Sequence, residues 1–423
     1  MGARDADVVI TGLGPVTSIG VGCDALWDSL AAGRANVHRQ SLPVDVGHSV
    51  ELPLASMPST PDVPGLGRHM DFLAGQGCGL YRDLGYSLLA MERALADAGL
   101  EYDRRRNNIG MVQAFEAPGV ERTVSRLFEL ITAPTPPGNG PPATYEFLAP
   151  CFYNIQPFVY VHLAGKALAL HGFSTSVHNA CASGAFAIDV AAQRIHSGQT
   201  DVMVVVGGEA FDTAVRLEWF RRLDLYADDQ YMRPFDAESS GFYVGEGAAA
   251  LVMESAAHAA KRGATPYAAY LGGGFAHQGW KQAVPDVRSA RLRDVIVQAL
   301  SVTGLSASDL DLIVPHGAST LLGDGYEASC LAQALDKGAP KAVATVFKPY
   351  VGHMLAASGL IETLCALLAM KHDSIPATLN SRAEHVQLAV PLVTKRLDQP
   401  IGTILKLSNG FTGHDAASIF AKV

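Results

Sequence analysis

The sequence predicts an α/β fold, because apolar runs of strand length alternate with helical segments along most of the chain. The predicted strands are residues 8–17, 108–114, 173–177, 201–209, 248–254, 267–271, 312–315, 342–346 and 404–407. Runs that are almost wholly apolar, such as 201–209, are typical of strands covered on both faces of a sheet. With 423 residues, 48% of them hydrophobic and 17% charged, the chain can bury a large core.

Helices are predicted between these strands. They cover residues 23–32, 88–98, 185–195, 289–303, 324–335 and 355–370. Residues 33–66 and 133–143 are rich in proline and glycine, which predicts loops, and the second of these loops is expected over a surface or a pocket mouth. Residues 1–256 and 257–423 each open with strand material and each hold a strand-to-helix turn with reactive residues. We therefore expect an N-terminal and a C-terminal α/β half.

The charge and the cysteines exclude several classes of protein. A formal net charge of −9 provides no large basic field, so nucleic acid is not an expected partner. The six cysteines form no Cys-x-x-Cys pair, which argues against a zinc ribbon or a thioredoxin motif. The polar N-terminal residues and the lack of a long uncharged apolar run predict neither a signal peptide nor a membrane span. We expect a cytoplasmic protein with reduced thiols.

One cysteine stands at a turn suited to a nucleophile. Cys181 lies between the predicted strand 173–177 and the predicted helix 185–195, in the run His178-Asn179-Ala180-Cys181-Ala182-Ser183-Gly184. A helix N-terminus favours a thiolate, so the pKa is expected to fall from ~8.5 towards ~7. The small neighbours leave room for a substrate to reach the sulfur. Cys23, Cys78, Cys330 and Cys365 fit the ordinary role of buried apolar residues.

Three further segments carry chemically active residues. His316 follows the apolar run that ends at Val314, and His353 lies in the segment that starts at Lys348 and leads into the helix with Glu362. The third segment surrounds Phe411 near the C-terminus, between glycines. One cysteine with two histidines at strand ends is typical of a thiolate nucleophile with imidazole helpers.

Together these segments resemble the β-ketoacyl-acyl-carrier-protein synthases, the ketosynthases of fatty acid and polyketide assembly. The resemblance covers nearly the whole chain and includes residues 10–17, 207–210, 233–236 and 245–247. It implies a thiolase-like fold of two similar α/β halves in a five-layer αβαβα arrangement. Cys181 would lie in the N-terminal half, and His316 and His353 in the C-terminal half.

The resemblance also implies a reaction and roles for the residues. Cys181 matches the family's nucleophile, and His316 and His353 match its catalytic histidines. Lys348 matches the family lysine, with Glu362 as its acidic partner. The implied reaction is a decarboxylative Claisen condensation of an acyl group on Cys181 with a malonyl-type thioester on an acyl carrier protein. Phe411 resembles the gate of the acyl pocket, and its N–H and that of Cys181 would form the oxyanion hole. Thr320 and Phe115 are expected to contact the substrate.

The chain departs from the family pattern around this site. The departures are Asn179, Ser239-Ser240, Ala318, Pro349, Val351, Asn409 and the absence of a glycine-rich run at 113–122. Residues 113–122 would border the acyl pocket at the dimer interface. A specialised enzyme of a natural-product pathway, such as a type II polyketide pathway, is therefore expected rather than one of ordinary fatty-acid synthesis.

Two other functions compete with this interpretation. An acyltransferase on the same scaffold would pass the acyl group from Cys181 to an amine, alcohol or thiol without decarboxylation. A non-catalytic chain-length subunit would lack the active cysteine, so Cys181, His316 and His353 argue against it.

The expected partners follow from the resemblance. The acyl carrier protein is expected in trans, and the chain is expected to form a homodimer or a heterodimer with a ketosynthase-like chain-length subunit. No metal or dissociable cofactor is implied. Arg216, Arg221 and Arg222 form a local basic group, which is either a solvated helix face or a docking surface for an acidic carrier. Arg221 falls close to where related enzymes place a docking arginine.

Overall fold

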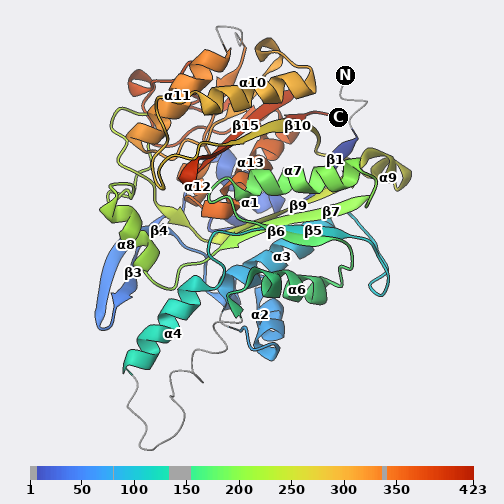
Figure 1. The fold of residues 1–423 in the computed structure, drawn as a ribbon, viewed down its shortest axis with the longest axis vertical. Coiled ribbons are helices and arrows are strands. Elements are labelled where there is room, and N and C mark those ends of the chain that lie inside the picture. Colours follow the sequence, from blue (N-terminus) through green and yellow to red (C-terminus); the bar gives the residue numbers. More distant parts are fainter. Residues whose placement is uncertain (1–6, 80, 133–153, 336–340) are drawn as a thin grey trace, which may run out of the picture.

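The computed structural model describes residues 7–79, 81–132, 154–335 and 341–423. Its main sheet joins the two halves of the chain (Figure 1). The strands follow one another in the order β12 (Val343–Ala344), β11 (Leu312–Val314), β15 (Thr403–Gly410), β16 (His414–Ala421), β10 (Ala268–His277), β1 (Val8–Thr17), β9 (Gly247–Ser255), β7 (Val202–Glu209), β5 (Gly110–Ala114) and β6 (Ser174–Val177), and β2 (Gly20–Val21) pairs with β1. The halves meet where β1 pairs with β10 in antiparallel register, Val9 opposite Ala269.

The elements stack in five layers (Figure 1). Helix α3 (Arg82–Asp97) covers the outer face of β1, β9 and β7, and α10 (Arg291–Thr303) covers the outer face of β10 and β16. Helices α7 (Ser183–His196) and α13 (Ser358–His372) lie between the two halves of the sheet. Helix α11 (Leu321–Leu335) packs beside α10. The predicted α/β fold and its αβαβα layering are therefore confirmed.

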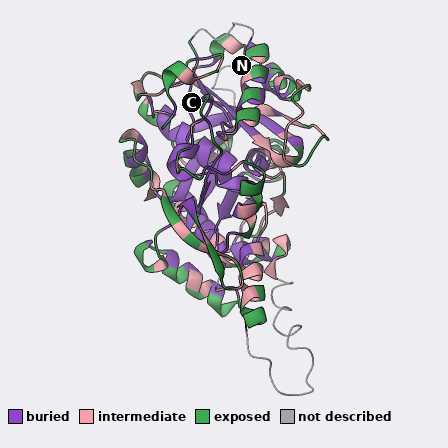
Figure 2. Cartoon of the chain, turned by 90° about the vertical axis from the view of Figure 1, so that its left-hand side faces the viewer, coloured by how far each residue is buried: buried purple, intermediate pink, exposed green. Residues whose placement is uncertain are grey.

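The middle layer is the most deeply buried part of the molecule (Figure 2). Residues Leu355–His372 are long and apolar enough to cross a membrane, yet 89% of that segment is buried. It is a core helix, because both of its faces pack against sheets.

Helices α7 and α13 approach each other closely through two glycines. A Cβ atom on Gly184 of α7 would lie 2.8 Å from the backbone nitrogen of Leu360, and one on Gly359 of α13 would lie 2.9 Å from that of Ala185. Each helix therefore needs glycine where the other helix's backbone passes.

The predicted loop at 33–66 is wrong. It contains a hairpin of β3 (His38–Asp45) and β4 (His48–Ala55), which β8 (Val244–Gly245) extends to a small sheet. The prediction failed because most residues of β3 are polar and partly exposed, and proline occurs in both strands at Pro43 and Pro53. The predicted loop at 133–143 lies outside the described residues.

The remaining elements surround the layers. They are α1 (Cys23–Ala31), α2 (Leu66–Gly75), α4 (Val120–Thr132), α6 (Pro157–Leu168), α8 (Val215–Arg222), α9 (Ala256–Lys261), α12 (Lys348–Val351), β13 (Ser374–Ile375), β14 (Leu397–Asp398), and the short 3-10 helices Thr60–Asp62, Ala307–Asp309, Leu355–Ala357, Ala383–His385 and Phe411–Gly413. Helix α4 extends from the body of the protein in Figure 1, whereas α8 lies beside the β3–β4 hairpin.

Candidate active site

Cys181 lies on the turn between β6 and α7, as predicted. Its side chain is buried, and the preceding Ala180 has a positive φ of 48°. The hydroxyl of Ser183 fixes the turn, since it accepts a hydrogen bond from the Asn179 N–H at 2.8 Å and donates one to the Ala180 carbonyl at 2.7 Å. The sulfur is therefore held two residues ahead of the first turn of α7.

The prediction of a low pKa for Cys181 is wrong for this structure. Burial raises the pKa of the thiol, and Glu116 and Glu209 raise it further when they are ionised. The ammonium of Lys348 and the backbone N–H of Phe411 favour the thiolate but do not outweigh the burial. The raised pKa leaves the sulfur as a neutral thiol at neutral pH.

His316 follows β11, and its backbone and ring are both held. Glu327 of α11 accepts hydrogen bonds from the N–H groups of His316 at 2.6 Å and Gly317 at 2.8 Å. The Nζ of Lys348 lies 2.6 Å from the His316 carbonyl oxygen and 3.3 Å from its Nδ1. Because an ammonium has donors only, Nδ1 is the acceptor and the ring proton sits on Nε2.

His353 is held by a different set of contacts. Its N–H donates to the Tyr243 carbonyl at 2.8 Å, and its Nδ1 lies 2.7 Å from the hydroxyl of Ser358. Its ring centroid lies 5.3 Å from that of His316. Burial and the nearby Lys348 lower the pKa of both histidines well below the usual range. Both imidazoles are therefore neutral at neutral pH.

A buried ion cluster connects the histidines to the core. Lys348 pairs with Oε1 of Glu362, as predicted, and the Nζ of Lys406 on β15 lies 2.6 Å from Oε2 of the same carboxylate. Sequence reasoning missed Lys406 and Glu327. The available signals were a single lysine inside the apolar run 404–407 and an acidic residue within the predicted helix 324–335.

A cavity of about 500 Å³ brings most of the predicted residues together. Cys181, His316, His353, Thr320 and Phe411 all line it. Four residues that depart from the family pattern also line its wall: Ser239, Ser240, Ala318 and Asn409. Thus a substrate in this cavity can contact the sulfur and both histidines.

Phe115 does not line this cavity. It is buried, and the centroid of its ring lies 5.1 Å from that of Tyr160 and 5.9 Å from that of His178. Its contact with a substrate stays a prediction.

Phe411 lies in a strained turn at the cavity. The next residue, Thr412, has a φ of 64° and its N–H donates to the Gln282 carbonyl at 2.6 Å. The centroid of the Phe411 ring lies 5.9 Å from that of Trp219 and 5.7 Å from that of Phe220, both on α8. Its backbone N–H lowers the pKa of the Cys181 thiol, so this N–H lies near the sulfur.

Helix α8 does not carry the predicted basic group as one surface. The side chains of Arg221 and Arg222 are 45% and 78% exposed and pair with Glu218. The side chain of Arg216 is instead only 14% exposed, and it pairs with Glu121 at 2.7 Å and Glu209 at 3.2 Å. Residues five and six positions apart on a helix point in different directions. The three arginines are therefore close in the sequence but do not share one face of the helix.

Solved structures that match this chain along its whole length place it in the class of thiolase-like ketosynthase folds. One is described as the ishigamide ketosynthase/chain length factor, with a TM-score of 0.84, 24% identity and coverage of 99% of both chains. Another is a beta-ketoacyl synthase from Burkholderia phymatum STM815, with a TM-score of 0.82, 26% identity, and coverage of 99% of this chain and 100% of that one.

The chain belongs to the β-ketoacyl synthase family. The family model for the beta-ketoacyl synthase N-terminal domain matches residues 84–259, and that for the C-terminal domain matches residues 267–382. A putative polyketide beta-ketoacyl synthase 1 of Streptomyces halstedii is 28% identical, with 97% of each chain covered. The 3-oxoacyl-[acyl-carrier-protein] synthase 2 of Rhizobium meliloti (strain 1021) is 29% identical, with 98% of each covered. The protein is accordingly an acyltransferase that catalyses decarboxylative condensation.

Proposed function

We propose that this chain is the condensing subunit of a specialised, type II polyketide-like pathway, with Cys181 as nucleophile. The observation that carries the assignment of residues is the shared cavity, in which the Cys181 sulfur, both neutral histidines and Phe411 meet. The departures that line the same cavity, Ser239, Ser240, Ala318 and Asn409, support a substrate other than a common fatty acyl chain.

The first step is transfer of the acyl group. The sulfur of Cys181 attacks the thioester carbonyl of the acyl carrier protein, and the bond to the carrier sulfur breaks. The proton of the Cys181 thiol leaves with the carrier thiol. The N–H groups of Cys181 and Phe411 stabilise the oxyanion of the tetrahedral intermediate.

The second step is decarboxylation. The thioester oxygen of the malonyl group accepts hydrogen bonds from His316 and His353. The bond to the carboxylate carbon breaks, carbon dioxide leaves, and the electron pair remains as an enolate whose oxygen these donors stabilise. The proton on Nε2 of His316, fixed by Lys348, suits this role because a neutral imidazole can donate from that nitrogen.

The third step forms the product. The enolate carbon attacks the acyl carbon on Cys181, a carbon–carbon bond forms, and the bond to the sulfur breaks. The released thiolate takes up a proton from solvent. The product is a β-ketoacyl thioester on the carrier protein.

We further propose a carrier protein in trans and a ketosynthase-like partner subunit, in the cytoplasm, where Cys181 stays reduced. Two kinds of relative support this: the ishigamide ketosynthase/chain length factor, and a type II polyketide acyl-carrier protein in complex with its ketosynthase. The division of the chain into halves 1–256 and 257–423 belongs to the same proposal.

The test combines intact mass with product analysis. The protein is incubated with acyl-carrier and malonyl-carrier thioesters, and acyl mass, carbon dioxide and β-ketoacyl product are recorded. We expect acylation of the wild type and of Cys78→Ala, a second buried cysteine, and none of Cys181→Ala. Acylation without carbon dioxide release would instead support the acyltransferase without decarboxylation, and acylation of Cys181→Ala would refute the nucleophile.

A further inference from the structure

Behind Cys181 the carboxyl ends of three neighbouring parallel strands meet. Strand β5 pairs with β6 and with β7, so that Ala114 lies opposite both Val177 and Gly207. Two residues further along each chain segment are Glu116, Asn179 and Glu209. Groups at the carboxyl ends of adjacent parallel strands face one crevice. Glu116 and Glu209 therefore lie beside the turn that carries Cys181, which agrees with their electrostatic effect on its sulfur.

The positively charged guanidinium of Arg216 lies in this crevice, and hydrogen bonds fix its position. The Nε of Arg216 donates to Glu121 at 2.7 Å, and its Nη2 donates to Glu209 at 3.2 Å. Glu121 also accepts hydrogen bonds from the N–H of Thr213, at 3.0 Å, and from its hydroxyl, at 2.7 Å.

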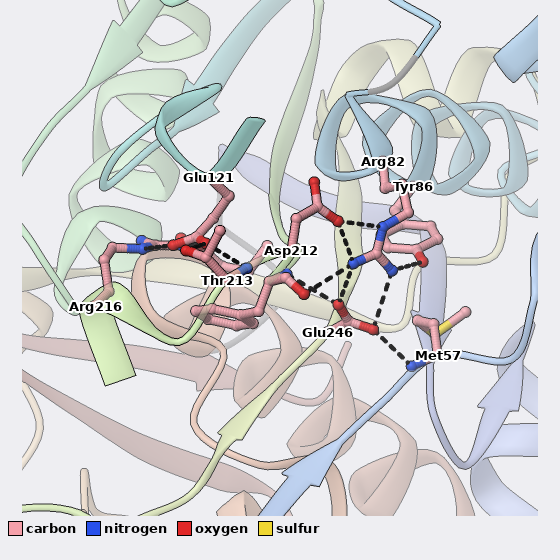
Figure 3. A network of polar contacts seen from close by, with 10 residues as sticks. Met57, Arg82, Tyr86, Glu121, Asp212, Thr213, Arg216 and Glu246 are labelled. Carbon is pink, nitrogen blue, oxygen red and sulfur yellow. Dashed lines mark hydrogen bonds and ion pairs between the residues drawn. The ribbon is translucent and has the colours of Figure 1, made fainter. Parts of the chain in front are cut away.

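The neighbouring residue Asp212 ties this group to a second cluster. It pairs with Arg82 at 2.8 Å, and Arg82 pairs with Glu246 at 2.8 Å (Figure 3). Both clusters thus brace the segment that leads into α8, so the guanidinium of Arg216 is held in place before any substrate binds.

Two polar atoms of this crevice are buried without a hydrogen-bond partner among the described residues. They are Nη1 of Arg216, a donor, and Oε2 of Glu116, an acceptor. A buried polar atom without a partner costs free energy, so a ligand that supplies both a donor and an acceptor is favoured there. A cavity of about 10 Å³ is lined by Arg216 and Glu209, but not by Glu116 or Cys181, and its volume is at the lower limit for one water-sized group.

We propose that Glu116 and Arg216 form a polar subsite for the acyl group on Cys181, and that it selects acyl chains bearing a hydroxyl group over hydrocarbon chains of equal length. A hydroxyl accepts a hydrogen bond from the guanidinium and donates one to the carboxylate. Glu116 stands in the segment where the family usually has a glycine-rich run, so the subsite belongs to this chain's own departures. The inference rests on the proposed function, because it needs the acyl group to be held on Cys181.

The experiment compares pairs of acyl-carrier thioesters that differ only in one hydroxyl group along the acyl chain. We measure kcat/KM for condensation with malonyl-carrier protein, and acylation of Cys181 by intact mass. For at least one hydroxyl position the wild type should favour the hydroxylated chain by roughly 10- to 100-fold, as expected for hydrogen bonds to charged groups. The exposed control Glu101→Gln should keep that preference.

Two variants at the subsite separate its role from a structural one. Glu116→Leu should lose the preference by gaining activity on the hydrocarbon chain, whereas Glu116→Gln, which keeps a hydrogen-bonding group, should retain part of it. Equal kcat/KM for both chains at every hydroxyl position in the wild type would overturn the subsite while leaving the proposed function intact. Failure to condense any chain would contradict the proposed function itself.

Discussion

At the scale of the residue, the three groups proposed to react in this ketosynthase rest in their uncharged forms. Burial favours the thiol of Cys181 and the neutral imidazoles of His316 and His353. A resting thiolate–imidazolium pair, as in cysteine proteases, is therefore absent from this arrangement of Cys181 and the two histidines. In the proposed mechanism, donors with fixed positions stabilise the charge that develops on the thioester oxygen.

The thiol state of Cys181 predicts the pH dependence of its alkylation. Because the pKa is raised, the thiolate fraction below that pKa grows about tenfold per pH unit. The rate of iodoacetamide alkylation at Cys181, followed by peptide mass, should rise steadily from pH 6 to pH 9 without levelling. Levelling near pH 7 would show that the helix N-terminus outweighs burial after all.

The two histidines should matter more for decarboxylation than for acylation. His316→Ala or His353→Ala each removes one donor to the enolate oxygen, which typically costs ~10²–10³ in rate. Release of carbon dioxide from malonyl-carrier protein should fall by that factor, while Cys181 still accepts an acyl group. His171→Ala, at an exposed position, is the matched control. Loss of acylation by the same factor would contradict this division of roles.

At the scale of the element, helix α8 links the surface to Phe411, the proposed gate. Its buried face places Phe220 against Phe411, and its exposed face carries Arg221, Arg222 and Trp219. A carrier protein that docks on the exposed face would therefore lie next to the turn that holds Phe411.

Charge reversal on α8 tests this docking. Arg221→Glu with Arg222→Glu should raise KM for carrier-bound acyl substrate about tenfold, more at low salt, because the carrier is acidic. Reaction with small-molecule thioesters should not change. Arg106→Glu, exposed elsewhere, serves as the control. Equal loss with both substrate types would refute docking at α8.

Sequence patterns predicted some elements well and failed on others for identifiable reasons. The turn at Cys181 was predictable because a strand, small residues and an apolar helix follow one another. Arg216 was misassigned because its partner Glu121 lies 95 residues away in the sequence. Lys406 was missed because the residues around it do not show that its ammonium pairs with the carboxylate of Glu362, which lies in another element.

At the scale of the whole molecule, buried acids make stability depend on pH. Burial raises the pKa of Asp415 to about 7 and that of Glu209 to about 8. A raised pKa means that the folded state holds the proton more tightly than the unfolded state. The stabilisation is complete below about pH 4 and is lost as pH rises through 7 to 8.

Urea unfolding should reveal that loss. Above about pH 7 the buried histidines are neutral in both the folded and the unfolded state, so the free energy of unfolding should fall between pH 7 and pH 8.5, by up to about 1.4 kcal/mol per pH unit for each such group. Asp415→Asn, which mimics the protonated form, should flatten the curve. Stability that rises over this range would contradict the raised pKa values. Asp236, whose pKa is lowered, finishes titrating below this range and adds no slope.

The reciprocal glycines of the middle layer also limit how such proteins can be recombined. Gly184 comes from the half with the nucleophile and Gly359 from the half with the histidines, and each admits the other's backbone. A chimera that joins residues 1–256 to the C-terminal half of another ketosynthase keeps this fit only if the donor has glycine at the matching position. The two halves must therefore coevolve at this contact, and half-exchange libraries should be screened for it first.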